Sequence, residues 1–205
     1  SYILFYSNNQ REAAFALYDE YQLDHRTNLL IAFLKATMAQ KTGKNDLAIR
    51  ILEERPQSDA YMKFEYIHFL YGKFKLYRLD SDADGYLLNF VKNFKGKHYI
   101  KEAYQKLAWH SLIIRNDYDQ YMYYMNQCMK LGNILIDEDK QAYNEAKSKD
   151  IPDPILLKSR LLFDGGYFKM ANELLASKSK LYMNHPFEGE YYYRMARIKD
   201  ALHEY

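Results

Sequence analysis

A small residue flanked by bulky ones recurs along this chain at nearly constant intervals. Each lies in the middle of a segment with helical apolar spacing, and successive members are 36, 36, 51 and 37 residues apart: Ala36, Gly72, Ala108, Ser159 and Ala196. A period in the thirties is typical of stacked helix pairs, because one pair cannot bury its apolar face without neighbours. The sequence therefore predicts an all-α fold, a right-handed superhelix of antiparallel helix pairs with about five repeats and one irregular insert.

The composition is that of a folded helical protein. Of the 205 residues, 48% are hydrophobic and 27% charged, and the 8 Gly and 4 Pro are few. The net charge of +2 argues against a dedicated nucleic-acid-binding protein, which usually has a strong basic excess. No run approaches the roughly 20 apolar residues of a membrane span. We therefore expect a soluble protein of the cytoplasm or the periplasm, and the abundance of Tyr, Lys and Asn is typical of an A/T-rich bacterial genome.

No catalytic or metal-binding constellation stands out. Cys128 is the only cysteine, which excludes an intrachain disulfide and a cysteine-based zinc site, and we expect it to be a small buried apolar residue. The six His do not pair on a shared helix face, and neither a nucleophile elbow nor a glycine-rich phosphate loop is present. The sequence therefore predicts a protein that is not an enzyme and that needs no metal and no cofactor.

One acidic segment resembles the first half of an EF-hand calcium loop. Carboxylates alternate over residues 80–84 and are followed by Gly85. The twelfth position of such a loop needs a bidentate carboxylate, but here it is Val91. We therefore interpret the segment as an acidic turn that caps a helix beginning near Asp84.

Apolar spacing and turn residues together predict where the helices lie. Residues 2–6 and 13–21 have helical spacing, and further helices are expected over residues 28–41, 47–52, 60–79, 84–94, 99–114, 118–131, 155–163, 167–177 and 188–205. Residues 133–153 form the irregular insert, with a short polar helix over residues 137–149 that the prolines at 152 and 154 stop. The insert is a spacer, a bend, or a boundary that separates residues 1–132 from residues 154–205.

Two segments resemble tetratricopeptide repeats (TPRs). Residues 42–52 and 165–175 each contain a turn glycine, an alanine five residues later and an apolar residue four further on: Gly43, Ala48 and Leu52, then Gly166, Ala171 and Leu175. The resemblance implies a TPR-like α-solenoid over residues 1–205. We expect it to be a fragment of a longer chain, because it stops inside an apparent helix. It also implies a scaffold for a protein or peptide partner without naming that partner.

The first helix of each pair is expected to line a concave groove. The residue after each mid-helix small residue then faces the groove, and other candidates lie one turn away. The candidate groove residues are Lys73, Tyr77, Gln105, Trp109, Arg160, Tyr193 and Arg197. Cations above an aromatic floor suit a peptide that carries acidic groups. The alternative is that Trp109 and the tyrosines fill seams between helices.

Two other modes of binding are open at this point. Lysines interleaved with aromatic residues over 92–101 suit single-stranded nucleic acid, but we interpret this stretch as a solvated loop and expect no nucleic acid. The alternative function is a self-assembly or regulatory module. Homo-oligomers would then form through the helix that carries Tyr121, Tyr123 and Tyr124, or through the last helix. The apolar face of that last helix is expected to be unpaired: Tyr192, Met195, Ile198 and Leu202.

Overall fold

The computed structural model describes residues 13, 16–17, 20–21, 23–56 and 64–203, and this part of the chain is helical without a β-strand. Its elements are α3 (Leu29–Lys41), α4 (Asn45–Glu53), α5 (Tyr66–Tyr77), α6 (Ala83–Asn93), α7 (Ile100–His110), η1 (Ser111–Arg115), α8 (Tyr118–Lys130), α9 (Asp137–Ser148), α10 (Pro154–Asp164), α11 (Phe168–Ala176), η2 (Ser179–Leu181) and α12 (Glu188–Leu202). The all-helical prediction is confirmed. The expected helix over residues 2–6, most of that over 13–21 and the expected start at residue 60 lie outside the described residues.

Short polar side chains begin several of these helices. The Asn28 side chain accepts hydrogen bonds from the backbone N–H groups of Leu30 and Ile31, which satisfies two donors at the start of α3. Asp153 caps α10 in the same way, and Pro154 is the first helical residue, where its missing N–H costs nothing. Pro154 therefore begins a helix as well as ending the preceding loop.

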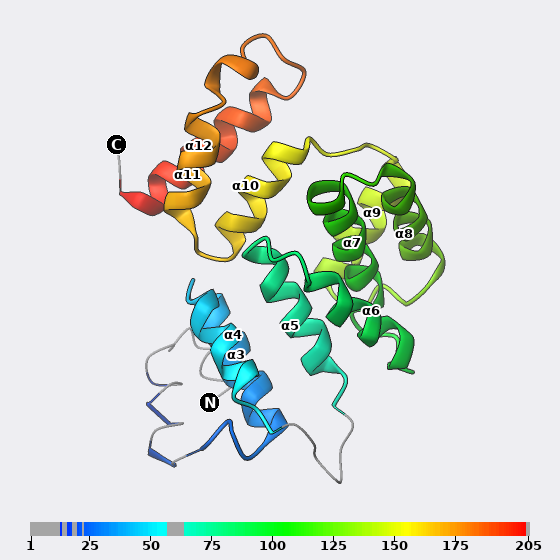
Figure 1. Cartoon of the computed structure of the whole chain (residues 1–205), viewed down its shortest axis with the longest axis vertical. Coiled ribbons are helices and arrows are strands. Elements are labelled where there is room, and N and C mark those ends of the chain that lie inside the picture. Colours follow the sequence, from blue (N-terminus) through cyan, green and yellow to red (C-terminus); the bar gives the residue numbers. More distant parts are fainter. Residues whose placement is uncertain (1–12, 14–15, 18–19, 22, 57–63, 204–205) are drawn as a thin grey trace.

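Helices adjacent in sequence pack as pairs, α3 with α4, α5 with α6, α7 with α8, and α10 with α11 (Figure 1). The small residues predicted for the first helices are buried in four of these pairs, at Ala36, Gly72, Ala108 and Ser159. At Gly72, a Cβ atom would come within 2.7 Å of the Leu87 side chain on α6, so this helix pair needs a glycine there. Ala196 on α12 is exposed, and its predicted place at a helix contact is wrong.

The helix expected over residues 99–114 changes its winding before it ends. After α7 the chain forms the π-helical turn η1, and Asn116 closes it in the left-handed conformation. The Ser111 carbonyl accepts a hydrogen bond from the Asp117 backbone N–H at 2.9 Å. The wider turn therefore absorbs extra residues before α8 begins.

The insert over residues 133–153 contributes a packed helix to the array. α9 contacts both α7 and α8, and Ala142 and Ala146 on it are buried. The Glu145 carboxylate accepts hydrogen bonds from the Trp109 indole N–H at 2.5 Å and from the Gln105 amide at 2.7 Å. These contacts give the insert a structural role, covering one face of α7.

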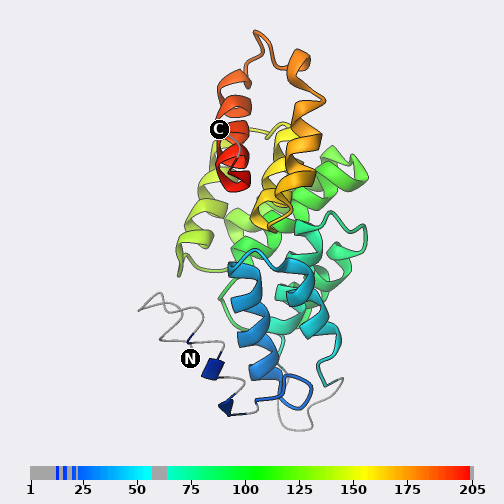
Figure 2. The same cartoon turned by 90° about the vertical axis from the view of Figure 1, so that its left-hand side faces the viewer.

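The α10–α11 pair contacts helix pairs far from it in sequence. The Gln40 side chain donates a hydrogen bond to the Asp164 carbonyl at 2.8 Å, and the Tyr167 hydroxyl donates one to Asp46 at 2.7 Å. α10 also packs against α5 and η1. Figure 2 shows α10–α12 towards one end of the long axis and α3–α4 towards the other, with the contact between them. In the expected array each pair contacts only its neighbours, so this long-range contact was not predicted.

The last helix is partnered within the chain. α12 packs on α10 and α11, and Tyr191 and Ile198 are buried in that contact. The predicted unpaired apolar face is therefore wrong for Ile198, while Tyr192 is 58% exposed. None of the helices in the described ranges is long and apolar enough to cross a membrane.

Candidate functional site

A cavity of about 380 Å³ lies where α3, α5, α7, α9 and the α10–α11 turn meet, and we call it the central cavity. Its wall is rich in charged side chains: Lys41, Lys73, Lys106 and Arg160 are the cations, and Glu102, Glu138 and Asp164 are the carboxylates. Tyr77, Phe163 and Phe168 add aromatic surface. A concave site between several helices with convergent polar groups is a candidate ligand-binding site.

The floor of the central cavity is a buried cluster of three charges. The Lys73 ammonium lies 2.7 Å from Glu102 Oε1, and the Lys106 ammonium lies 3.6 Å from the same oxygen. Glu102 is only 1% exposed. No group in the described part of the chain donates a hydrogen bond to its other oxygen, Oε2. A buried carboxylate oxygen without a donor is costly, and the two ammonium groups beside Oε1 offset part of that cost.

The close approach of these groups shifts their pKa values. Burial lowers the pKa of Lys106 to about 8, because the attraction of Glu102 offsets only part of the cost of desolvation. Burial also acts against charge on Lys73 and Glu102. Their mutual attraction is stronger, so the pKa of Lys73 is raised and that of Glu102 is lowered. The Lys73–Glu102 pair is therefore ionised at neutral pH.

The indole ring of Trp109 makes cation–π contacts with two of the cations. The Lys106 ammonium lies 3.9 Å from the centre of the indole ring, and the Arg160 guanidinium carbon lies 4.7 Å from it. The indole N–H is fixed by its hydrogen bond to Glu145 on α9. Cations at these distances are attracted by the ring face, so α9 orients Trp109 and Trp109 orients the cations.

Arg160 is a partly exposed donor at the site. Its guanidinium donates no hydrogen bond within the described ranges, and its ion pair with Asp164 spans 3.8 Å. Arg160 also lines a second, narrower hollow together with Arg194 and Arg197 of α12, which we call the α10–α12 hollow. Because planar guanidinium groups bind carboxylates with two hydrogen bonds, Arg160 is suited to an acidic group.

The structure places the seven predicted groove residues in four settings, and five of the seven lie in or beside the two hollows or on the surface. Lys73, Tyr77 and Arg160 line the central cavity together. Arg197 lines the α10–α12 hollow and stacks on Phe163 at 4.4 Å. Tyr193, also on α12, is 61% exposed.

Two of the predicted groove residues do not face the groove. Gln105 and Trp109 are each 1% exposed, because α9 covers the face of α7 from which they project. Their predicted accessibility is therefore wrong. For Trp109, the structure agrees with the alternative that the ring fills a seam between helices.

Sequence reasoning missed the charges at the centre of the site. Glu102 and Lys106 are four residues apart on α7, and Trp109 lies seven residues after Glu102, so all three share one helix face. This spacing was visible in the sequence. A Glu–Lys pair at this separation is usually solvent-exposed, however, and only the packing of α9 and α10 shows that this one is buried.

The other sequence candidates have structural roles. Asp80 and Asp82 pair with Lys75, and the side chain of Asp82 does not cap α6, contrary to the expected capping turn. Lys101 is buried rather than solvated, and its ammonium donates to three carbonyls at the end of α8. Cys128 is buried as predicted, and burial raises the pKa of its thiol to about 12. No set of three or more His, Cys, Asp or Glu residues in the described chain is arranged to hold a metal.

Comparisons with known proteins identify no relative. No family model, no curated protein and no solved structure matches this chain. The tetratricopeptide resemblance therefore stays a prediction that depends on the helix pairs and turn residues themselves.

Proposed function

We propose that this protein is a non-catalytic scaffold, a TPR-like array of helix pairs that binds an acidic segment of a partner protein. The binding groove is the central cavity together with the adjoining α10–α12 hollow. The observation that supports it most strongly is the placement of Arg160. Its guanidinium belongs to both hollows and has no hydrogen-bond acceptor within the described ranges.

The charges along the groove favour an acidic occupant. Arg194 and Arg197 on α12 continue the line of cations from Arg160, and Phe163 provides an apolar surface below Arg197. Arg194 is already paired with Glu190 on its own helix. Arg160 and Arg197 are therefore the two residues expected to contribute most to binding, because arginine beside aromatic surface is typical of binding hot spots.

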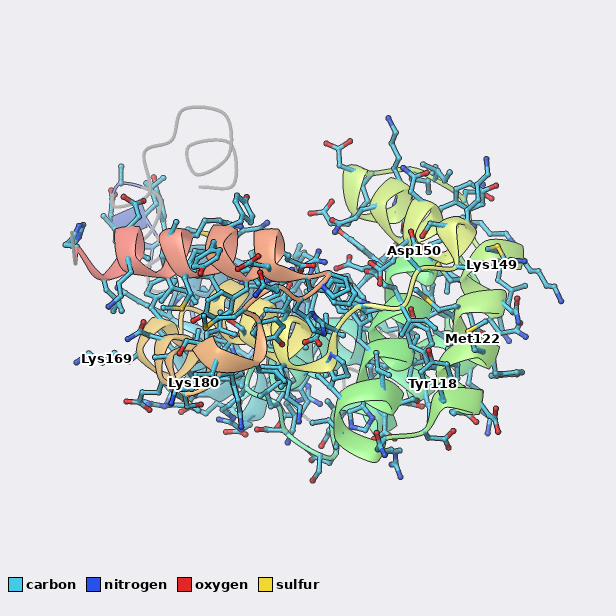
Figure 3. The ribbon with its side chains drawn as sticks, turned by 90° about the horizontal axis from the view of Figure 1, so that it is seen from above. Tyr118, Met122, Lys149, Asp150, Lys169 and Lys180 are labelled. Carbon is cyan, nitrogen blue, oxygen red and sulfur yellow. The ribbon has the colours of Figure 1, made fainter. Side chains whose placement is uncertain are left out.

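An array of synthetic twelve-residue peptides tests the proposal. The peptides carry two to four Asp or Glu residues, and a matched set carries Asn and Gln in their place. We expect the wild-type protein to retain acidic peptides and Arg160→Glu with Arg197→Glu to lose them. The control is Lys169→Glu with Lys180→Glu, which makes the same charge change at exposed sites (Figure 3) that do not line the groove. Equal retention by both double variants would contradict the proposal.

Self-assembly through a helix face is the second candidate, because α8 exposes aromatic side chains. Tyr118 is 50% exposed and Tyr123 is 52% exposed, and Figure 3 shows Tyr118 and Met122 on the α8 side of the molecule, across from Lys169 and Lys180. Light scattering over a concentration series distinguishes the two candidates. A mass that grows with concentration in the wild type and stays constant in Tyr118→Ser with Tyr123→Ser would support self-assembly.

A further inference from the structure

Two segments that lead into α7 and out of α8 carry lysines and no carboxylates. Residues 85–101 contain four lysines and residues 120–136 contain one, and neither segment includes an Asp or a Glu. Four of these five lysines are exposed and have no ion-pair partner within the described ranges: Lys92, Lys95, Lys97 and Lys130. Their charges are therefore free to attract an anionic surface.

The two segments meet, because the start of α7 packs against the loop between α8 and α9. The Lys101 ammonium donates a hydrogen bond to the Leu131 carbonyl at 3.1 Å. A Cβ atom on Gly132 would come within 2.8 Å of the Ile100 side chain, so the loop backbone lies directly on α7. Lys97 comes three residues before Ile100, a span of at most about 10 Å. Figure 1 shows this loop on the side of the molecule away from α11 and α12.

The same loop exposes three large aliphatic side chains. Leu131 is 42% exposed, Ile134 is 48% exposed and Leu135 is 47% exposed. The backbone that carries them is fixed at both ends, by the hydrogen bond from Lys101 and by that from the Leu135 N–H to Asp139 Oδ2 at 3.2 Å. Three such side chains within five residues form an apolar patch, unlike the single exposed residues that are normal on a protein surface.

Lysines beside exposed aliphatic side chains suit the surface of an anionic lipid bilayer. Lipid phosphates attract the ammonium groups, and the acyl-chain boundary just beneath them accepts the aliphatic side chains. The long lysine stems let each charge reach a phosphate while the stem stays on apolar surface. Asp137 is the exposed carboxylate nearest to the loop along the chain, and the four exposed lysines outnumber it.

Nucleic acid fits this surface less well. Its phosphates would pair with the lysines, but the aliphatic side chains would stay in water. Its bases stack on aromatic rings, and Leu131, Ile134 and Leu135 provide none. The combination of charge and aliphatic surface therefore favours lipid.

We propose that the surface formed by Lys92, Lys95, Lys97 and Lys130 with Leu131, Ile134 and Leu135 binds anionic lipid bilayers. The lysines contact lipid phosphates, and the aliphatic side chains enter the boundary between head groups and acyl chains. This inference goes beyond the proposed scaffold function and does not depend on it, since none of these residues lines the central cavity or the α10–α12 hollow.

Co-sedimentation with lipid vesicles tests the assignment. One set of vesicles contains equal parts of phosphatidylcholine and phosphatidylglycerol, and the other contains phosphatidylcholine alone. We expect the protein to sediment with the anionic vesicles at about 0.1 M sodium chloride, to be released at about 0.5 M, and not to sediment with the neutral ones. Absence of sedimentation with the anionic vesicles would overturn the proposal and favour a protein partner for this surface. Equal sedimentation with both vesicles would overturn it as well.

Two double variants connect the lipid to its contacts. Lys95→Gln with Lys97→Gln is expected to weaken vesicle binding about 30-fold, because each lysine near an anionic surface contributes roughly fivefold. Ile134→Ser with Leu135→Ser is expected to weaken it about tenfold or more, because the apolar insertion is lost. All four positions are exposed, so both variants are expected to fold, and circular dichroism checks this.

The control is Lys169→Gln with Lys180→Gln, which removes two exposed lysines outside this surface and should bind vesicles like the wild type (Figure 3). An equal loss in the control and in Lys95→Gln with Lys97→Gln would show that only the net charge matters and would overturn the assignment. Unchanged binding in Ile134→Ser with Leu135→Ser would also overturn it. None of these measurements uses a peptide, so their failure is separate from failure of the scaffold proposal.

Discussion

Gly166 and Gly43 meet backbone to backbone at the junction between the first and last described helix pairs. A Cβ atom on Gly166 would collide with the carbonyl group of Gly43, and both residues have positive φ angles, +81° and +76°. The two glycines belong to the α10–α11 and α3–α4 turns, which are more than 120 residues apart in the sequence. Their contact therefore holds together one edge of the central cavity.

Gly166→Ala is expected to be the most costly alanine substitution among three glycines. It places a side chain in a left-handed conformation and against a backbone carbonyl, which cannot move aside, so we expect a loss of at least about 2 kcal/mol in the free energy of unfolding. Gly43→Ala has only the conformational cost, about 1 kcal/mol, because its nearest neighbour is 3.9 Å away. Gly85→Ala on α6 should stabilise by about 0.5–1 kcal/mol. Urea denaturation followed by circular dichroism measures the free energy of unfolding of the three variants. Equal losses of stability in Gly166→Ala and Gly43→Ala would contradict the close contact between the two glycines.

The local pattern of residues predicted the helices well and their long-range contacts poorly. The turn motif identified both Gly43 and Gly166, because tight reversals need residues that tolerate positive φ. Nothing in either segment indicates that the two turns touch. Their contact depends on the path of the chain between them, along which α9 packs on α7 and α8 and α10 packs on α5.

The candidate site was predictable only in part for the same reason. Lys73 and Arg160 followed from the helical period, since each comes directly after a buried small residue. Trp109 occupies the equivalent position on α7, but α9 covers it. Burial of Glu102 also could not be predicted, because it depends on Lys73 arriving from a different helix.

Glu145→Ala is expected to loosen α9 from α7. The substitution leaves two buried donors without an acceptor, the indole N–H of Trp109 and the amide of Gln105, so we expect a loss of about 2 kcal/mol or more. Trp109 is the only tryptophan of the chain, so its fluorescence reports the change directly. Asn144→Ala on the exposed side of α9 is the control. An unchanged emission spectrum and an unchanged urea midpoint in Glu145→Ala would show that these hydrogen bonds do not hold α9.

Lys106 should make stability rise with pH on the alkaline side of neutrality. Its pKa is lowered by burial to about 8, whereas a lysine in the unfolded chain has a pKa of about 10.4. Between these values the unfolded chain binds more protons than the folded protein, so the free energy of unfolding increases with pH. The increase attributable to Lys106 is on the order of 1–2 kcal/mol between about pH 8 and 9.5.

Lys106→Met tests this expectation. In Lys106→Met the free energy of unfolding should no longer increase between about pH 8 and 9.5. In Lys92→Met, on an exposed face of α6, the increase should remain. The measurement is the difference in urea midpoint between wild type and variant at pH 7.5, 8.5 and 9.5. Higher pH is avoided because the raised pKa values of Lys73 and Tyr77 have the opposite effect there: their stabilisation is lost as the pH rises. If the urea midpoints of the wild type and of Lys106→Met change with pH in the same way, the lowered pKa of Lys106 is contradicted.

The role of the recurring small residues in helix packing can be tested by comparing a buried one, Gly72, with the exposed one, Ala196. Gly72→Leu places a side chain where a single Cβ already comes within 2.7 Å of Leu87 and 3.0 Å of the Ala83 carbonyl, so we expect the α5–α6 pair to lose about 3 kcal/mol. Ala196→Leu occupies the equivalent position in the sequence period but projects into solvent, and its effect should remain within about 0.5 kcal/mol. The measurement is the thermal melting temperature of each variant compared with that of the wild type. A large loss in Ala196→Leu would show that another molecular surface covers α12, whereas tolerance of Gly72→Leu would show that close helix approach is not what the period encodes.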